Sequence, residues 1–219
     1  MTKRALLLGL LLLAIGCTDE SRYDQAVAVL IDVSCTYADQ KTDVVRIIKR
    51  ELLPSLEPGD TMIVVRIDSE SYQKENLEAL VTLDPRPSRA NAQKLGVARK
   101  LDAFAASGTR SEFTDIPGAM MLAAEYLREV ASGTRVMLVF SDMREDLPAG
   151  SRRNLDESEF EGIQVLAMNV KRLDSDNADP AVFRGRLARW ERRVTHSGAA
   201  GWRTFMDSSK LPDYLAAIR

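Results

Sequence analysis

The sequence is poor in the residues on which disulfide-rich and zinc-binding proteins depend. Its 219 residues include two cysteines, Cys17 and Cys35, and one histidine, His196. At most one disulfide bond can form, so the fold must bury a hydrophobic core instead of depending on a disulfide framework. The apolar run at residues 5–15 is shorter than the roughly 20 residues that a membrane-spanning helix needs.

The chain also lacks an excess of charge of one sign. It has 30 lysines and arginines against 32 aspartates and glutamates, a net charge of −2. No basic field extends over the whole molecule, so we expect no nucleic-acid partner. With 45% hydrophobic and 28% charged residues, 12 glycines and 8 prolines, the composition is that of an ordinary globular protein and excludes collagen-like and disordered classes.

The first residues have the pattern of an export signal. Lys3 and Arg4 precede the apolar run, and small residues precede Cys17. The segment Leu-Ala-Ile-Gly-Cys at 13–17 resembles a bacterial lipoprotein signal, in which cleavage falls before a cysteine that then carries lipid. We therefore predict a signal peptide at 1–16, a lipid-anchored Cys17 with a short linker at 17–25, and one domain at 26–219. The alternative is a plain secretory signal that is cut nearby.

Both interpretations export the protein. Without residues 1–16, 28 basic residues remain against 32 acidic ones, so the exported chain has a net charge of −4. A lipid on Cys17 would anchor it to a bacterial membrane, facing the periplasm. Thr18 stands where many lipoproteins retained at the inner membrane have aspartate, which favours the outer membrane.

Apolar runs and helical periodicities alternate along the remaining chain. Apolar runs predict strands at residues 26–32, 62–68, 135–140, 162–170 and 202–206, and an edge strand at 80–83 that Pro85 and Pro87 close. Helical spacing predicts helices at residues 42–54, about 95–105, 116–130, 183–194 and 211–218. This alternation predicts an α/β fold, a doubly wound, mostly parallel sheet with helices on both faces.

Small oxygen-bearing side chains follow the predicted strand ends. Asp32, Ser34 and Thr36 follow the first strand, Thr114 precedes the helix that Asp115 caps, and Asp142 follows the strand at 135–140. Ligands of open parallel sheets bind at the carboxyl ends of the strands, where these residues converge. Two carboxylates and three hydroxyls, with no His or Cys pair, favour a hard cation such as Mg²⁺ or Mn²⁺ over zinc.

This set of residues resembles a von Willebrand factor type A (vWA) domain with its metal-ion-dependent adhesion site. In that family an Asp-x-Ser-x-Ser/Thr sequence follows the first strand, a threonine precedes a helix, and an aspartate follows the next central strand. Asp32, Ser34, Thr36, Thr114 and Asp142 match these positions in order, and the resemblance covers residues 24–219. Many members have glycine beside the last two positions, whereas this chain has Phe113 and Met143.

The resemblance implies binding without catalysis. Asp32, Ser34, Thr36, Thr114 and Asp142 would hold the cation, and a partner protein's Asp or Glu would complete its coordination. A domain without metal, which binds partners through its loops alone, is one alternative.

A second alternative is a Mg²⁺-dependent phosphohydrolase. Haloacid-dehalogenase-like enzymes also have aspartate at the tip of the first strand, in Asp-x-Asp-x-Thr, and Asp32 would then be the nucleophile. Ser34 replaces the second aspartate, which serves those enzymes as general acid and base, so this interpretation is disfavoured.

Three further features receive interpretations of their own. We expect Cys35 to be buried and His196 to be exposed. The arginines at 184, 186, 189, 192 and 193 are expected on the solvated face of an amphipathic helix. The loop at 143–161 either shapes specificity beside the site or is a mobile surface insertion.

Overall fold

The strand at the centre of the sheet is the first one in the chain. The computed structural model describes residues 23–219, and its sheet has the order β3-β2-β1-β4-β5-β6. The strands are β1 (Gln25–Asp32), β2 (Thr61–Ile67), β3 (Leu77–Thr82), β4 (Thr134–Phe140), β5 (Ile163–Met168) and β6 (Gly201–Phe205). All neighbours are parallel except the edge strand β3, which runs antiparallel to β2. This arrangement confirms the predicted doubly wound, mostly parallel sheet.

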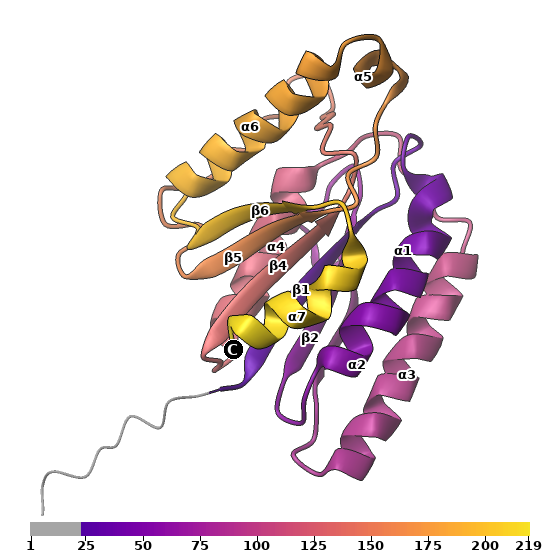
Figure 1. Cartoon of the computed structure of the whole chain (residues 1–219). Coiled ribbons are helices and arrows are strands. Elements are labelled where there is room, and N and C mark those ends of the chain that lie inside the picture. Colours follow the sequence, from indigo (N-terminus) through magenta and orange to yellow (C-terminus); the bar gives the residue numbers. More distant parts are fainter. Residues whose placement is uncertain (1–22) are drawn as a thin grey trace, which may run out of the picture.

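Helices cover both faces of this sheet (Figure 1). They are α1 (Lys41–Ile47), which continues through a π-helical segment (Ile48–Leu52) into α2 (Leu53–Ser55), then α3 (Pro87–Ala106), α4 (Ile116–Glu129), α5 (Asp174–Ala178), α6 (Pro180–His196) and α7 (Leu211–Ala217). Short 3₁₀ turns occupy Ala38–Gln40, Lys74–Asn76 and Ser208–Lys210. Of the helices α1 to α7, α5 has no counterpart in the sequence prediction, because its five residues, four of them polar, carry no hydrophobic period.

The alternation of side chains along β1 divides the core into two layers. Val27, Val29 and Ile31 pack with residues of α1, α3 and α7, whereas Ala28 and Leu30 pack with residues of α4 and α6. All eight residues of β1 are buried, as expected of a central parallel strand that is covered on both faces.

Two residues of the predicted helices lie on a face that their pattern did not indicate. Leu95 in α3 is 61% exposed, because the buried stripe of that helix runs through Ala90, Val97 and Leu101. Arg186 in α6 was expected in solvent and is buried instead, where its guanidinium pairs with both carboxylate oxygens of Asp176. The second error arises because the partner lies in α5, which carries no pattern of its own.

The predicted leader lies outside the described residues. The signal peptide at 1–16 and the lipidated Cys17 both fall there, and β1 begins at Gln25, one residue before the predicted domain boundary. Among residues 23–219, no helix combines the length and hydrophobicity that crossing a membrane requires.

A buried aspartate joins both ends of the described chain at the amino edge of the sheet. Asp60, in the turn before β2, accepts hydrogen bonds from the backbone N–H of Gln25 at 2.8 Å and of Glu57 at 2.7 Å. The guanidinium of Arg219 donates to both of its oxygens, at 2.9 and 2.8 Å. Asp60 is fully buried, and these donors satisfy both of its carboxylate oxygens.

We predict that Asp60→Ala lowers the free energy of unfolding by about 3 kcal/mol, because it leaves two backbone donors and a largely buried guanidinium without their acceptor. Urea denaturation would measure this loss. Glu57→Ala is the matched control, since Glu57 also lies near Arg219, at 3.7 Å, but its side chain is 65% exposed. The control should change stability by less than about 1 kcal/mol. Equal losses in both variants would contradict the special role of Asp60.

Candidate metal centre

Two central strands end side by side and bring Asp32 next to Ser141 and Asp142. In the register of β1 and β4, Ile31 pairs with Phe140, the last residue of β4, so Asp32 and Ser141 are level with each other. The hydroxyl of Ser141 donates to Oδ2 of Asp32 at 2.6 Å. The parallel register therefore produces the predicted proximity of the two strand ends.

Asp32 is held in a dry environment that disfavours its charge. The side chain is fully buried, and its other oxygen, Oδ1, accepts a hydrogen bond from the backbone N–H of Ser34 at 2.8 Å. Burial raises the pKa of Asp32 to about 6, against the opposing effect of the Ser141 and Ser34 hydrogen bonds, and the nearby Asp142 raises it further. A carboxylate in this state would be stabilised by a cation.

Asp142 is also fully buried, and one of its oxygens lacks a donor. Its Oδ1 accepts from the backbone N–H of Arg144 at 2.8 Å, whereas Oδ2 has no hydrogen-bond partner among residues 23–219. A buried carboxylate oxygen without a partner is costly, and native structures contain few. The orphan oxygen lies where the sequence predicts a metal ligand.

The pairing of the other buried aspartates makes these two distinctive. Five aspartates of the described residues are fully buried. Three of them pair with arginine: Asp60 with Arg219, Asp115 with Arg153 and Asp176 with Arg186. Within residues 23–219, neither Asp32 nor Asp142 forms an ion pair with a basic side chain. The two carboxylates without a basic partner are the two that lie together.

The hydroxyls of Ser34 and Thr36 lie beside each other on the loop after β1. Their oxygens are 3.3 Å apart, with Ser34 buried and Thr36 exposed. Two ligands on adjacent positions of an octahedral Mg²⁺, each about 2.1 Å from the ion, are about 3.0 Å apart. The observed separation fits such a pair, so these two hydroxyls could both bind the hard cation that the resemblance implies. Residues 23–219 contain no cluster of three or more His, Cys, Asp and Glu side chains that could hold a metal, so hydroxyls would have to supply part of the coordination.

Thr114 lies on a loop that is connected to both strand ends. Its backbone forms an isolated antiparallel bridge with Asp146 after β4, with N···O distances of 2.6 and 3.1 Å. Three residues earlier, Ser111 forms a parallel bridge with Ser34 after β1. The loop is therefore held between the two segments that carry the other predicted ligands, and the Thr114 side chain is buried.

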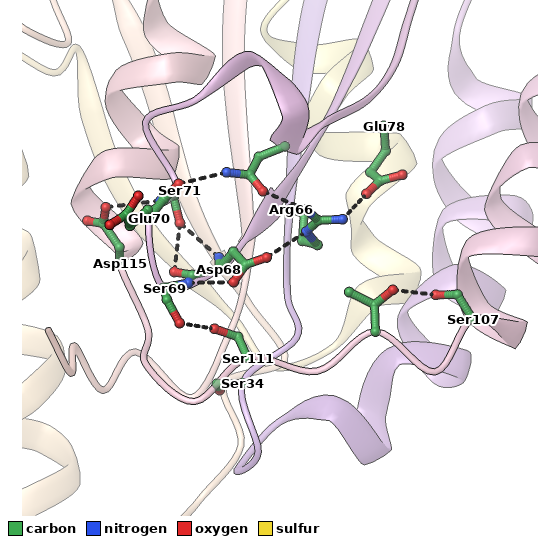
Figure 2. Close-up of polar contacts among 12 residues, drawn as sticks. Ser34, Arg66, Asp68, Ser69, Glu70, Ser71, Glu78, Ser107, Ser111 and Asp115 are labelled. Atoms are coloured by element: carbon green, nitrogen blue, oxygen red, sulfur yellow. Dashed lines mark hydrogen bonds and ion pairs between the residues drawn. The ribbon is translucent and has the colours of Figure 1, made fainter. Parts of the chain in front are cut away.

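A network of hydrogen bonds among serines and acids, which the sequence analysis did not identify, supports this loop (Figure 2). The hydroxyls of Ser69 and Ser111 are 2.7 Å apart, and the backbone N–H of Phe113 donates to Ser69 at 3.2 Å. Ser69 and Ser71 belong to the turn after β2, and the backbone N–H of Ser71 donates to Asp115 at 3.1 Å. No spacing within the sequence links residues 69–71 with 111–115, so only the fold shows these contacts.

Asp115 fixes the start of α4 directly after Thr114. Its carboxylate accepts from the backbone N–H of Gly118 at 2.9 Å, which confirms the predicted N-cap. A side chain at position 118 would meet this carboxylate, because a Cβ atom there would lie 2.2 Å from Oδ2. Arg153, which belongs to the 143–161 loop, forms an ion pair with Asp115 at 2.9 Å. This loop is therefore attached to the base of the candidate site.

Met143 adopts the backbone conformation that glycine usually supplies. Its φ is 60°, in the left-handed region, and its side chain is buried with residues of α4 and α6. Its N–H donates to Ser141 Oγ at 3.0 Å, and the indole N–H of Trp190 donates to its carbonyl at 2.8 Å. The turn after Asp142 is therefore made despite the absence of glycine, and packing offsets the strain.

The expectations for the cysteine and the histidine had different outcomes. Cys35 is exposed, not buried as predicted, because it lies on the loop after β1 between Ser34 and Thr36, beyond the part of the chain that the sheet buries. His196, the last residue of α6, is exposed as expected.

Comparisons with known proteins agree on the fold alone. No protein-family model matches the chain, and no curated protein does. Among solved structures, it is similar to an aerotolerance-related membrane protein from Bacteroides fragilis NCTC 9343 (15% identity, TM-score 0.51) and to the conserved hypothetical protein BatB from Bacteroides thetaiotaomicron (15% identity, TM-score 0.52). Each match covers 89% of this chain, and 97% and 98% of the other chains.

A third similar structure is the PilB minor pilin from Streptococcus sanguinis, with 11% identity and a TM-score of 0.54, covering 90% of this chain and 60% of the pilin. At these identities the likeness concerns the fold and not the residues of a site. The doubly wound α/β fold predicted from the sequence is confirmed by the sheet topology together with these neighbours.

The raised pKa of Asp32 predicts a pH-dependent stability in the absence of metal. Because the folded-state pKa lies above the ordinary value of 3.8, ionisation of Asp32 costs the folded state. The wild type should therefore lose stability relative to Asp32→Asn as the pH rises from about 4 to above 6. The shift corresponds to about 3 kcal/mol at most. Denaturation with chelator present at each pH would measure the difference between the two proteins; a difference that stays constant from pH 4 to 7 would contradict the prediction.

Met143 predicts an unusual order of stability between alanine and glycine variants. Both substitutions remove a buried side chain and should cost about 2–5 kcal/mol. Glycine relieves the left-handed strain, so Met143→Gly should be more stable than Met143→Ala by about 1 kcal/mol. At Met137, which is buried within β4, alanine should be the more stable replacement. Thermal or urea denaturation of the four variants tests this, and the same order at both positions would refute it.

Proposed function

We propose that this chain is an exported, vWA-like binding protein. In this proposal Asp32, Ser34, Thr36, Thr114 and Asp142 hold a divalent cation, Mg²⁺ or Mn²⁺, and a partner protein's Asp or Glu binds there. The observation that supports it most is the contrast among the buried aspartates: Asp32 and Asp142 have no basic partner, and Oδ2 of Asp142 has no donor among the described residues. A bound cation would satisfy both.

The five proposed ligands would contribute neutral and negatively charged oxygens to the site. The hydroxyls of Ser34, Thr36 and Thr114 offer neutral oxygens, while Asp32 and Asp142 supply two negative charges. Two carboxylates balance one dication, so an incoming carboxylate would not be repelled by the site. When bound, the cation would supply an open coordination position for that carboxylate. Ser141 and the N–H groups of Ser34 and Arg144 orient the two aspartates for this task.

The polarity of β1 suits a tethered binding protein. The chain enters the sheet at Gln25 and reaches Asp32 at the opposite end of β1, about 23 Å further on at 3.3 Å per residue. A domain anchored through Cys17 would therefore present the candidate site at the edge away from its tether. An envelope location in the periplasm, at the outer membrane, is part of this proposal, and likeness to an aerotolerance-related membrane protein and a minor pilin supports it at the level of fold.

The phosphohydrolase alternative has less support. Asp32, its nucleophile, is fully buried, and each of its oxygens already accepts a hydrogen bond. Ser34 stands where a general acid and base would be required. Turnover of a generic phosphomonoester that is lost in Asp32→Asn would favour the hydrolase, whereas the binding proposal expects no turnover.

The proposal is tested by titrating Mg²⁺ and Mn²⁺ into a fragment from Thr18 to Arg219, which retains every strand and helix described above. Calorimetry should detect binding to the wild type. Asp142→Ala and Thr114→Val should each weaken binding by at least about tenfold, because each removes a predicted oxygen ligand.

Asp146→Ala is the matched control for this titration. Asp146 lies four residues after Asp142, its side chain is exposed, and it contacts Thr114 only through its backbone. Its removal should leave cation affinity within about twofold of the wild type, as expected of an exposed charge. Unchanged affinity in Asp142→Ala and Thr114→Val would show that the metal site is wrong, and the absence of any heat with the wild type would favour the scaffold without metal.

A further inference from the structure

A pocket rich in arginine opens directly beside the candidate metal centre. It has a volume of about 360 Å³ and is lined by Met143, Arg144, Glu145, Arg186, Arg189, Trp190 and Arg193. The first three of these residues follow Asp142 in the chain, and the others belong to α6. The sequence analysis interpreted the arginines of this helix as a solvated face, whereas the fold gathers three of them with Arg144 around one cavity.

The charges of this pocket do not cancel. Arg193 is neutralised by Glu145 at 2.6 Å, and Arg186 by the buried Asp176. Arg144 and Arg189 are exposed, and neither contacts a carboxylate within residues 23–219. The pocket therefore keeps two unpaired guanidinium groups, although the chain as a whole has a net charge of −2. Guanidinium groups in this state are ready to bind a carboxylate or phosphate.

Hydrogen bonds and a cation–π contact hold the pocket wall in place, which suits recognition. The indole of Trp190 is fixed by its hydrogen bond to the carbonyl of Met143, and the guanidinium of Arg193 lies over the indole ring, 5.1 Å from its centroid. Arg193 also donates to the carbonyl of Arg153 at 2.7 Å, so the 143–161 loop and α6 form one wall. A charged ligand would meet a surface whose shape is already set.

The spacing to the metal centre indicates what kind of ligand would use the pocket. Arg144 is two residues from Asp142, so their Cα atoms are at most about 7 Å apart. In an extended peptide, side chains two residues apart point the same way and are also about 7 Å apart. A segment that places one carboxylate at the metal centre can thus place a second one over Arg144 and Arg189.

We propose that this pocket binds a second carboxylate of the partner, so that the partner is recognised through an extended segment with acidic residues at alternate positions. The inference rests on the proposed function for its first carboxylate, while the arginine pocket acts without a cation. A protein segment is favoured over a lipid headgroup because of where the pocket lies. It adjoins the carboxyl end of β4, whereas the chain, with its proposed membrane anchor, enters the sheet at the opposite end, at Gln25.

The test uses two labelled peptides, Gly-Glu-Gly-Glu-Gly and Gly-Glu-Gly-Gln-Gly, titrated into the ¹⁵N-labelled chain with Mg²⁺. Binding is followed by NMR, and the indole N–H signal of Trp190 reports on the pocket; the only other tryptophan is Trp202. The diacidic peptide should bind about fivefold more tightly than the monoacidic one and shift the Trp190 signal. In Arg144→Gln/Arg189→Gln this advantage should disappear.

A matched control makes the same change of net charge with two arginines of α6 outside the pocket. Arg184 and Arg192 of α6 are exposed and do not line the pocket, so Arg184→Gln/Arg192→Gln should retain the fivefold advantage. If both double variants lose it equally, the effect comes from overall charge and the pocket is refuted. If the wild type shows no advantage, the inference is also overturned.

Two further arms separate this inference from its alternatives. With a chelator, both peptides should weaken by the same factor, and the advantage of the diacidic peptide should persist. If the chelator leaves the affinity for both peptides unchanged while Arg144→Gln/Arg189→Gln removes the advantage, the proposed metal function fails and the pocket stands. Vesicles containing phosphatidylglycerol form the last arm: sedimentation that depends on Arg144 and Arg189, without a peptide effect, would replace the protein segment by a lipid headgroup.

Discussion

Asp32 and Asp142, at the carboxyl ends of β1 and β4, are buried carboxylates without a basic partner among residues 23–219. The other contacts at this end of the sheet depend on how these two side chains are held. The parallel register of β1 and β4 places Asp32 against Ser141 and Asp142, and burial then raises the pKa of Asp32. Around this pair the backbone is held by specific donors and bridges: the N–H groups of Ser34 and Arg144, and the bridges of Ser111 with Ser34 and of Thr114 with Asp146. Such support is expected where an energetically costly arrangement has to be kept in one geometry.

The architecture could be predicted from the sequence because its signals are local. The apolar run of β1 is continuous since both faces of that strand are covered, and the proline and aspartate at the start of α4 act within one turn of the helix. The edge position of β3 followed from the prolines after it. Where an element is short and almost entirely polar, as α5 is, no hydrophobic periodicity exists to detect, so the sequence predicts neither α5 nor the burial of Arg186 that depends on it.

Only part of the candidate site could be predicted from local signals of this kind. Asp32, Ser34, Thr36, Thr114 and Asp142 could be selected because each lies next to the end of an element that the sequence predicts. The supporting contacts could not, since they join residues distant in the chain, such as Ser69 with Ser111 or Arg153 with Asp115. The conformation of Met143 was hidden for a related reason: its strain is compensated by Ser141 and by Trp190, 47 residues away in α6. The exposure of Cys35 likewise depends on where the sheet ends, not on the residue's own preference for burial.

The pairing of buried charges divides the fully buried aspartates of residues 23–219 into two groups. Asp60, Asp115 and Asp176 each pair with an arginine that offsets part of the cost of burying a carboxylate, and the pairs of Asp60 and Asp115 connect segments far apart in sequence. Asp32 and Asp142 have no arginine partner in this part of the chain, so the packing of β1 and β4 has to offset the free-energy cost of burying these two carboxylates. A ligand that binds only the folded state restores stability in proportion to its binding. Under the proposed function, the missing positive charge would give this edge of the sheet an affinity for a cation, and an arginine placed there would stabilise the fold while removing that affinity.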